Sequence, residues 1–255
     1  VNEKKALSQI NCKLNQGDFV TVIGGNGSGK STLLNCIAGV HVPETGKIIL
    51  EQQDITKTPE YIRASKIARV FQDPLQGTAE SMTLEENLVI ALKRGKKRGF
   101  KKAIKEEERQ LFRERLAVLN LGLEKRLKDK VGLLSGGQRQ ALTLLMATLQ
   151  KPKLLLLDEH TAALDPQTAN KVIELTEWLV KEFKLTTLMV THNMEQALKY
   201  GNRIIMMDRG NIVLDLKDEK KEKLTVNKLM EHFAVTGKGN LNNDKMLLSK
   251  WSNAC

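Results

Sequence analysis

Short, mostly apolar runs alternate along the chain with segments of helical periodicity. The runs at Phe19–Ile23, Leu154–Leu157 and Leu185–Val190 are bounded by turn-forming or charged residues, which is typical of strands buried on both faces of a parallel sheet. Between the second and third runs, apolar residues recur at helical spacing from Val172 to Phe183, so this segment is predicted to be a helix with one face on the sheet. A strand, helix, strand order indicates an α/β layer fold.

Two further patterns extend this picture. The segment Arg203–Asp215 contains two apolar runs that meet at Arg209–Gly210, which predicts an antiparallel β-hairpin. From about residue 83 to residue 150 no convincing strand pattern is present, so we expect a helical subdomain inserted into the α/β core. The positions that mark an amphipathic helix in this span are Ile104, Leu111, Phe112, Leu116 and Leu119.

Length and composition define the expected domain organisation. The chain has 255 residues, of which 41% are hydrophobic and 28% charged, as in ordinary globular proteins. We predict a single domain over residues 1–235 and a loose tail over residues 236–255. No apolar run approaches the ~18 residues of a membrane span, and we expect no secretory signal. The three cysteines lie far apart in the sequence, which favours a reducing, cytoplasmic setting.

The net charge of +11 comes in part from eight basic residues between Lys93 and Lys105. Nucleic acid, anionic lipid and plain solvation are all compatible with such a run. Phe100 is its one aromatic residue, so the run lacks the interleaved stacking side chains of a single-strand binding surface. We favour a solvated face, with proximity to an anionic membrane surface next, and we expect no nucleic acid partner.

The stretch TVIGGNGSGKSTLLNCIAG, from Thr21 to Gly39, matches the pattern G-x-x-x-x-G-K-[ST]. Glycines let successive backbone N–H groups approach phosphate oxygens closely, and the helix that follows presents its positive N-terminus to the same anion. The lysine of this pattern reaches the β- and γ-phosphates and the serine hydroxyl ligates Mg²⁺. The predicted phosphate-binding residues are Gly24, Gly25, Asn26, Gly27, Ser28, Gly29, Lys30, Ser31 and Thr32.

Acidic residues end the buried run in KLLLLDEH. A strand that ends at Asp158 places this carboxylate at the carboxyl edge of the sheet, beside the glycine loop, where it would hold Mg²⁺, usually through water. Glu159 is then placed to polarise a water that attacks the γ-phosphate. Without a phosphate loop in the same chain, an apolar run followed by two acids would be weak evidence.

A second glycine-containing helix start lies in LLSGGQRQALTLLMATL, from Leu133 to Leu149. Ser135 can cap the helix that follows, and Gly136 and Gly137 expose backbone N–H groups at its start. The segment is therefore either a second anion-binding helix N-terminus or a plain helix cap.

With these motifs, the chain resembles the ATP-binding subunits of ABC transporters from about Leu14 to Leu214. LSGGQ (Leu134–Gln138) is that family's signature. GGNGSGKST and LLLLDE look like its Walker A and Walker B motifs. FQDP resembles the Q-loop with Gln72, AALD the D-loop that ends at Asp165, and MVTHN the switch region with His192.

This resemblance implies a P-loop NTPase core with a mostly parallel sheet, an antiparallel β portion and the inserted helical subdomain. It also implies an ATP-dependent homodimer in which the glycine loop of one chain and LSGGQ of the other sandwich each ATP. Ser135 and Gly137 are then expected to contact the γ-phosphate across the interface, while His192 binds it in cis. Gln72 is expected to contact Mg²⁺ or the attacking water. The remaining residues implied at the nucleotide are Gly136, Gln138 and Asp165.

Two features depart from the family pattern. The family usually has proline after the Walker B glutamate, where this chain has His160; this histidine could hydrogen-bond nearby groups or face solvent, and we favour solvent. The family also places an aromatic residue upstream of the glycine loop to stack on adenine, yet residues 1–18 contain no Phe, Tyr or Trp. Because the sequence begins at Val1 rather than methionine, we expect that residue to lie in a segment upstream of it.

The resemblance also implies partners. We expect an ATPase subunit at the cytoplasmic face of the cell membrane that powers solute transport through a separate permease, with an extracellular solute-binding protein in the same system. The stretch GTAESMTLEENLVIALKRG resembles cassettes of uptake systems for amino acids or related small solutes. An iron–sulfur assembly ATPase of the same superfamily remains the alternative, and the solute is not encoded in this chain.

Overall fold

The computed structural model describes residues 5–96 and 104–236. Its main sheet has the strand order β4-β5-β6-β1-β7-β8. The first five of these strands in space run parallel and β8 is antiparallel to β7. Their bounds are β1 Phe19–Ile23, β4 Ile67–Val70, β5 Leu154–Asp158, β6 Thr187–Val190, β7 Arg203–Asp208 and β8 Asn211–Lys217.

The strands follow from their side-chain patterns. Strands β1 and β6 are buried at every position, and β5 at every position before Asp158, because helices cover both faces of the sheet. Leu155 and Leu157 pack with α5 and α6 on one face, while Leu154 and Leu156 pack with α1 on the other. Strand β8, which lies at the sheet edge, alternates between exposed and partly buried residues, as expected for a strand with one solvated face.

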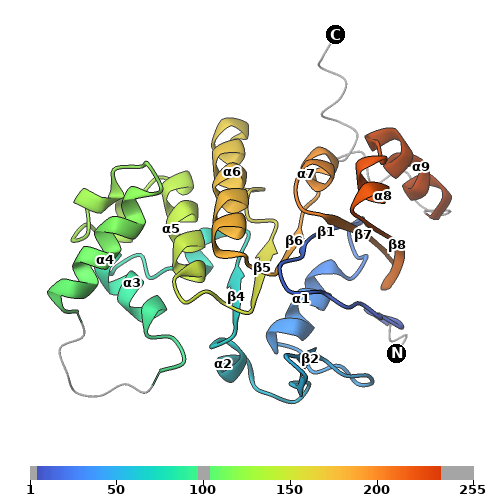
Figure 1. Cartoon of the computed structure of the whole chain (residues 1–255), viewed down its shortest axis with the longest axis horizontal. Helices are drawn as coiled ribbons and strands as arrows, with labels where there is room; N and C mark the ends of the chain where they lie inside the picture. The colour runs from blue at the N-terminus through green and yellow to red at the C-terminus, as the bar shows by residue number, and fades with distance from the viewer. Residues whose placement is uncertain (1–4, 97–103, 237–255) are drawn as a thin grey trace, which may run out of the picture.

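Helices surround the main sheet (Figure 1). Helices α3, α4 and α5 share a hydrophobic cluster whose fully buried members all lie between Leu84 and Met146. The helix bounds are α1 Lys30–Ala38, α2 Glu60–Arg63, α3 Leu84–Leu92, α4 Glu106–Ala117, α5 Gly136–Thr148, α6 Pro166–Phe183, α7 Met194–Lys199, α8 Glu219–Glu222 and α9 Val226–Thr236.

A small antiparallel pair, β2 (Ile49–Leu50) with β3 (Gln53–Asp54), lies apart from the main sheet. Together with the hairpin of β7 and β8, this pair makes up the antiparallel part of the fold. The hairpin turn falls at Arg209–Gly210, as the sequence predicts. The fold class expected from the sequence, an α/β core with a mostly parallel sheet and some antiparallel strands, is therefore confirmed.

The helix predicted around Ile104–Leu119 is shorter than its apolar pattern. Helix α4 spans Glu106–Ala117, and of the marked residues Phe112 and Leu116 are fully buried within it. Ile104 and Leu119 flank the helix and still pack on the same cluster. The apolar pattern therefore marks residues that contact the core, and these residues continue past both ends of α4.

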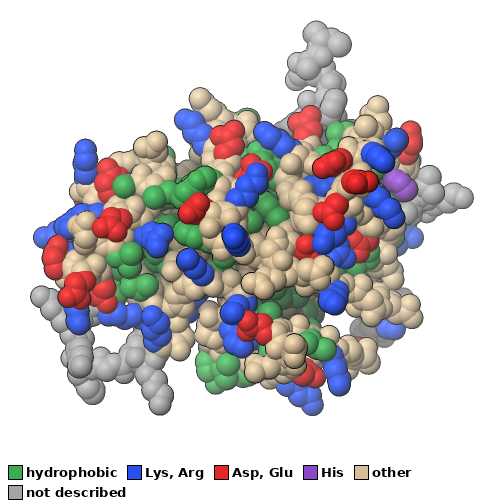
Figure 2. Space-filling model, in the orientation of Figure 1, with side chains coloured by type: hydrophobic (Ala, Val, Ile, Leu, Met, Phe, Trp, Pro, Cys, Tyr) green, Lys and Arg blue, Asp and Glu red, His purple; other side chains and the backbone are tan. Residues whose placement is uncertain are grey.

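Basic and acidic side chains are interleaved over the face that Figure 2 shows. Most of the basic run, residues 97–103, lies outside the described residues. At its start, Lys93 pairs with Glu108 at 3.2 Å, and Arg94 Nη2 donates to the carbonyl of Ala147 at 3.5 Å. These two cations are thus tied to α4 and α5.

Candidate nucleotide-binding site

The motif residues of the α/β core gather at one edge of the main sheet. Strands β4, β5, β6 and β1 are parallel neighbours, so their carboxyl ends lie at the same edge. Gln72 follows β4, Asp158 ends β5, His192 follows β6, and the glycine loop follows β1. In open α/β sheets, ligands bind outside the carboxyl ends of the strands.

Lys30 lies inside the turn of the glycine loop. Its Nζ donates to the carbonyls of Gly24 at 2.7 Å and Gly25 at 3.0 Å, and only 5% of the residue is exposed. Gly29 precedes α1 with a φ of 101°, a left-handed conformation that favours glycine. A Cβ on Gly29 would lie 2.7 Å from the carbonyl oxygen of Ala6, so the turn has no space for a side chain there.

The glycine loop is supported from the β7–β8 turn. Gly210 N donates to the carbonyl of Ser28 at 2.9 Å, and a Cβ on Gly24 would lie 2.4 Å from the carbonyl oxygen of Met207. The hydroxyl of Ser28 is buried and has no hydrogen-bond partner among the described residues. A closely approached backbone, a buried lysine and an unpaired hydroxyl together fit the oxygens of a phosphate chain.

Glu159 and His192 meet at the ends of β5 and β6. His192 Nε2 lies 2.5 Å from Glu159 Oε1, and the side chain of Glu159 is only 13% exposed. Glu159 has a φ of 47°, unusual for a residue other than glycine, and its N–H donates to the carbonyl of Val190 at 3.0 Å. These contacts place the Glu159 carboxylate against His192 at the carboxyl edge of the sheet.

Asp158 is held from the neighbouring strand. Arg69 Nη2 lies 2.6 Å from Asp158 Oδ2, and Arg69 Nη1 donates to Asn35 Oδ1 at 2.7 Å. Asn35 lies on α1, one helical turn after Ser31. The carboxylate of Asp158 and the hydroxyl of Ser31 are oxygen ligands of the kind that Mg²⁺ prefers, so these residues fit that ion beside a nucleotide.

The expectation that His160 faces solvent is wrong. The residue is 2% exposed and its Nε2 lies 2.9 Å from the hydroxyl of Thr176 on α6. That hydroxyl donates its one hydrogen to the carbonyl of Val172 at 2.8 Å, so His160 Nε2 must be the donor in this contact. Nε2 therefore carries a hydrogen. Burial lowers the pKa of His160 to about 4, so the ring is neutral at neutral pH.

The burial of His160 predicts an acid-sensitive term in stability. Unfolded histidine has a pKa of about 6.5, so between pH 6.5 and 4 the unfolded chain binds more protons and stability falls as pH falls. From pH 7.5 to pH 5 this term amounts to about 2 kcal/mol. We expect His160→Gln, whose amide can still donate to Thr176, to lack it. Denaturant unfolding of the nucleotide-free protein at both pH values measures the difference, and equal losses in the two proteins would contradict the burial of His160.

The signature segment starts α5 with a capping box. Ser135 Oγ accepts from the N–H of Gln138 at 3.3 Å, and Gln138 Oε1 accepts from the N–H of Ser135 at 3.1 Å. Ser135 and Gly136 are exposed. A Cβ on Gly137 would lie 2.2 Å from Thr168 Cγ2, so this glycine is required for α5 to approach α6. A helix cap, one of the two alternatives that the sequence left open, is present, and it engages the N–H of Gln138.

The D-loop residue Asp165 caps the neighbouring helix α6. Its Oδ1 accepts from the N–H of Thr168 at 3.0 Å, and the hydrogen bonds from the side chain and backbone of Thr168 lower the pKa of Asp165. Asp165 and the signature start therefore lie on adjoining helix N-termini. Helices α5 and α1 lie on opposite sides of β4 and β5 in Figure 1, and they pack on opposite faces of the main sheet.

Gln72 is exposed just after β4. The preceding residue contacts two side chains that sequence reasoning missed. Gln140 Nε2, on the signature helix α5, donates to the carbonyl of Phe71 at 3.3 Å, and the Arg69 guanidinium lies 4.7 Å from the centre of the Phe71 ring. Gln140 lies two residues beyond LSGGQ, and its position so near the motif could have indicated a role at the site. Nothing in the sequence pattern distinguished Arg69.

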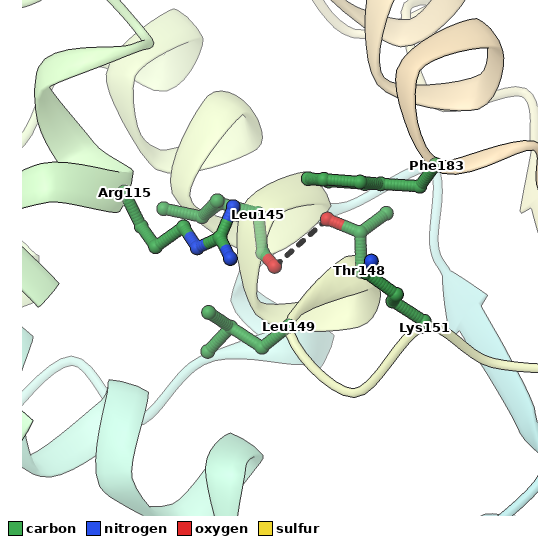
Figure 3. A pocket seen from close by; sticks show the side chains of 6 residues that line it. All are labelled: Arg115, Leu145, Thr148, Leu149, Lys151 and Phe183. Carbon is green, nitrogen blue, oxygen red and sulfur yellow. Dashed lines mark hydrogen bonds between the residues drawn. The ribbon is translucent and has the colours of Figure 1, made fainter. Parts of the chain in front are cut away.

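A small pocket lies away from this edge (Figure 3). It is formed where α4, α5 and α6 meet, and Phe183 packs there with the Arg115 guanidinium at 5.5 Å and Lys151 Nζ at 5.4 Å from the ring centre. None of the motif residues lines it. We interpret it as packing between the helices.

Comparisons with known proteins agree with this site. A family model described as ABC transporter matches residues 7–162. A tyrosine transport ATP-binding protein of Clostridioides difficile is 51% identical over 227 residues, which cover 89% of this chain and 90% of that protein. A xylose/arabinose import ATP-binding protein of Sulfolobus acidocaldarius is 35% identical, over 93% of this chain and 92% of that protein.

Solved structures give the same result. A dimeric ATP-binding cassette in a post-hydrolysis state, bound to ADP and Pi, superposes with a TM-score of 0.70 at 32% identity, over 83% of this chain and 90% of that one. A nucleotide-free cassette from an ABC transporter gives a TM-score of 0.71 at 30% identity, over 90% and 91%. The chain therefore belongs to the ABC transporter family, and it is an ATP-binding subunit of that class with ATPase activity.

Among the described residues, no helix has the length and apolar character needed to cross a membrane.

Proposed function

We propose that this chain hydrolyses Mg²⁺-ATP at the carboxyl edge of its sheet to power solute transport through a separate membrane permease. The observation that carries the proposal is the convergence of Lys30, Asp158 and the Glu159–His192 pair on neighbouring strand ends. A phosphate cradle, a carboxylate ligand and a positioned base are the parts that phosphoryl transfer to water requires.

The residues then divide the reaction between them. Backbone N–H groups of Gly24–Thr32 and the Nζ of Lys30 bind the phosphates, and Glu159 accepts a proton from the attacking water. His192 holds the Glu159 carboxylate through Nε2, and its ring also binds the γ-phosphate. Mg²⁺ supplies neutralisation of the negative charge on the β- and γ-phosphate oxygens when bound. Its proposed protein ligands are Ser31, Gln72 and Asp158.

We propose that two chains pair head to tail around two ATP molecules. Because α5 and α1 pack on opposite faces of the sheet, we infer that a second chain presents Ser135, Gly136, Gly137 and Gln138 to the γ-phosphate. Asp165 caps the neighbouring helix and would lie at the same interface. The dimeric cassette to which this chain is similar supports this arrangement.

The proposed domain has the extent expected from the sequence. Residues 1–235 form a single ABC ATPase domain and residues 83–150 its helical subdomain, which the separate hydrophobic cluster of α3, α4 and α5 supports. The predicted tail, residues 236–255, lies almost wholly outside the described residues.

The proposed setting is the cytoplasmic face of the cell membrane, with a permease and an extracellular solute-binding protein as partners. Similar cassettes carry names as different as tyrosine transport, xylose/arabinose import and spermidine/putrescine import, so the solute is selected outside this subunit. We propose an amino acid, with tyrosine first, because the relative that is 51% identical carries that name.

Uptake of labelled tyrosine in cells that lack this chain tests the proposal. We expect uptake to fall, to recover with the unchanged chain, and to remain low with Glu159→Gln, which separates ATP hydrolysis from mere presence of the subunit. Other labelled amino acids and a sugar, run in parallel, define the solute class. Unchanged uptake of all these solutes together with loss of iron–sulfur enzyme activity would instead favour the assembly ATPase.

A further inference from the structure

Arg69 lies on β4, three residues before Gln72, and its side chain contacts the two elements that carry the other proposed Mg²⁺ ligands, Ser31 and Asp158. Its Nη2 lies 2.6 Å from Oδ2 of Asp158 at the end of β5, and its Nη1 donates to Oδ1 of Asn35 on α1 at 2.7 Å. Asn35 follows Ser31 by four residues, so both lie on one face of α1.

The geometry of these contacts is well defined. The side chains of Arg69 and Asp158 are 14% and 15% exposed, and the guanidinium is further held against the Phe71 ring, 4.7 Å from its centre. A planar guanidinium presents its donors in a rigid fork, so its two Nη atoms fix Asp158 and Asn35 relative to each other. A lysine at this position could not make both contacts in that geometry.

The contact with Asp158 engages one carboxylate oxygen. The other oxygen, Oδ1, makes no hydrogen bond or ion pair that the described part of the chain provides. The arginine therefore sets the orientation of the carboxylate and directs Oδ1 as the acceptor for a metal ion or its water. Partners that orient metal-ligating carboxylates typically change metal affinity by about 10–100-fold when mutated.

We propose that Arg69 is a positioning residue for the metal that accompanies the nucleotide. Through Asn35 and Asp158 it fixes α1 and β5 at the spacing that lets Ser31 and Asp158 act on one ion. The inference rests on the proposed Mg²⁺-ATP function and adds to it a residue that contacts neither nucleotide nor metal. The positioning role depends on the planar shape of the Arg69 guanidinium, because a positive charge alone beside the site would oppose the binding of a cation.

The test measures metal binding without catalysis. Mn²⁺ is titrated into the protein–ADP complex, with protein in excess, and free Mn²⁺ is followed by its EPR signal. We expect Arg69→Lys and Asn35→Ala to weaken Mn²⁺ binding by about 10-fold, while ADP affinity in EDTA stays unchanged because neither residue contacts the glycine loop. Arg203→Lys is the matched control, since Arg203 also forms a strand-to-strand ion pair, with Asp215, but at the opposite end of the sheet. It should leave Mn²⁺ affinity unchanged.

Three results would count against the inference. Unchanged Mn²⁺ affinity in both variants with lowered thermal stability would show that the ion pair only joins β4 to β5. Normal affinity in Arg69→Lys with tighter binding in Arg69→Met would assign the effect to charge instead of geometry. A loss in Arg203→Lys equal to that in Arg69→Lys would indicate a general effect of strand packing. If the unaltered protein binds ADP in neither EDTA nor Mn²⁺, the proposed function itself fails.

Discussion

Glu159→Gln should retain ATP binding while its hydrolysis rate falls by roughly 10²-fold or more, the usual scale for a positioned general base. The reason is local. The glutamine amide can still contact His192, which lies 2.5 Å from Glu159 Oε1 in the native protein, but it cannot accept a proton from water. Binding is measured by equilibrium titration with ATP, and turnover by phosphate release under saturating ATP.

Two companion variants make this result specific. Lys30→Ala should instead weaken ATP binding itself, because it removes the buried cation of the glycine loop. His192→Ala should lower turnover and leave binding largely intact, since it removes the partner that holds Glu159. Near-normal phosphate release by Glu159→Gln would exclude Glu159 as the base, whatever the effect of the other two variants.

The parts of the fold that the sequence predicted share a physical cause. Strands β1 and β5 were predicted because a strand covered on both faces must be apolar at nearly every position, and α6 because its apolar face recurs at helical spacing. The glycine loop was predicted because only a residue without a side chain lets the backbone come as close to neighbouring carbonyl oxygens as it does at Gly24 and Gly29. Each of these signals is local in the sequence.

The residues that prediction missed depend on contacts between distant segments. Arg69 and Asp158 are 89 residues apart in the chain, and neither the spacing nor the chemistry of Arg69 marks it as different from other strand arginines. His160 was predicted to face solvent, with a hydrogen bond to nearby groups as the alternative. Its burial and its contact with Thr176 on α6 join two segments whose pairing the local sequence pattern does not indicate. Tertiary pairing of polar groups leaves no periodic trace in a sequence.

Mixing two inactive variants should restore part of the ATPase activity if the sites are shared between chains. Lys30→Ala damages the glycine loop and Ser135→Arg blocks the signature helix start, so each homodimer has two damaged sites. In a mixed dimer one site collects both lesions, and the other has an intact loop facing an intact signature. Random mixing makes about half of the dimers mixed, so recovery should reach roughly a quarter of the unaltered activity if the two sites act independently in a closed twofold dimer.

The existence of recovery is more informative than its size, since coupling between the sites would lower it. The assay is run at high protein concentration, and Glu159→Gln supplies the control because it should run as a dimer with ATP and as a monomer without it. Mixing each variant with itself gives the baseline. If the Glu159→Gln dimer forms but mixing restores nothing, crosslinking across Ser135 decides between coupled sites and unshared ones. If ATP produces no dimer at all, the head-to-tail arrangement is wrong, because the exposed start of α5 would then have no glycine loop to face.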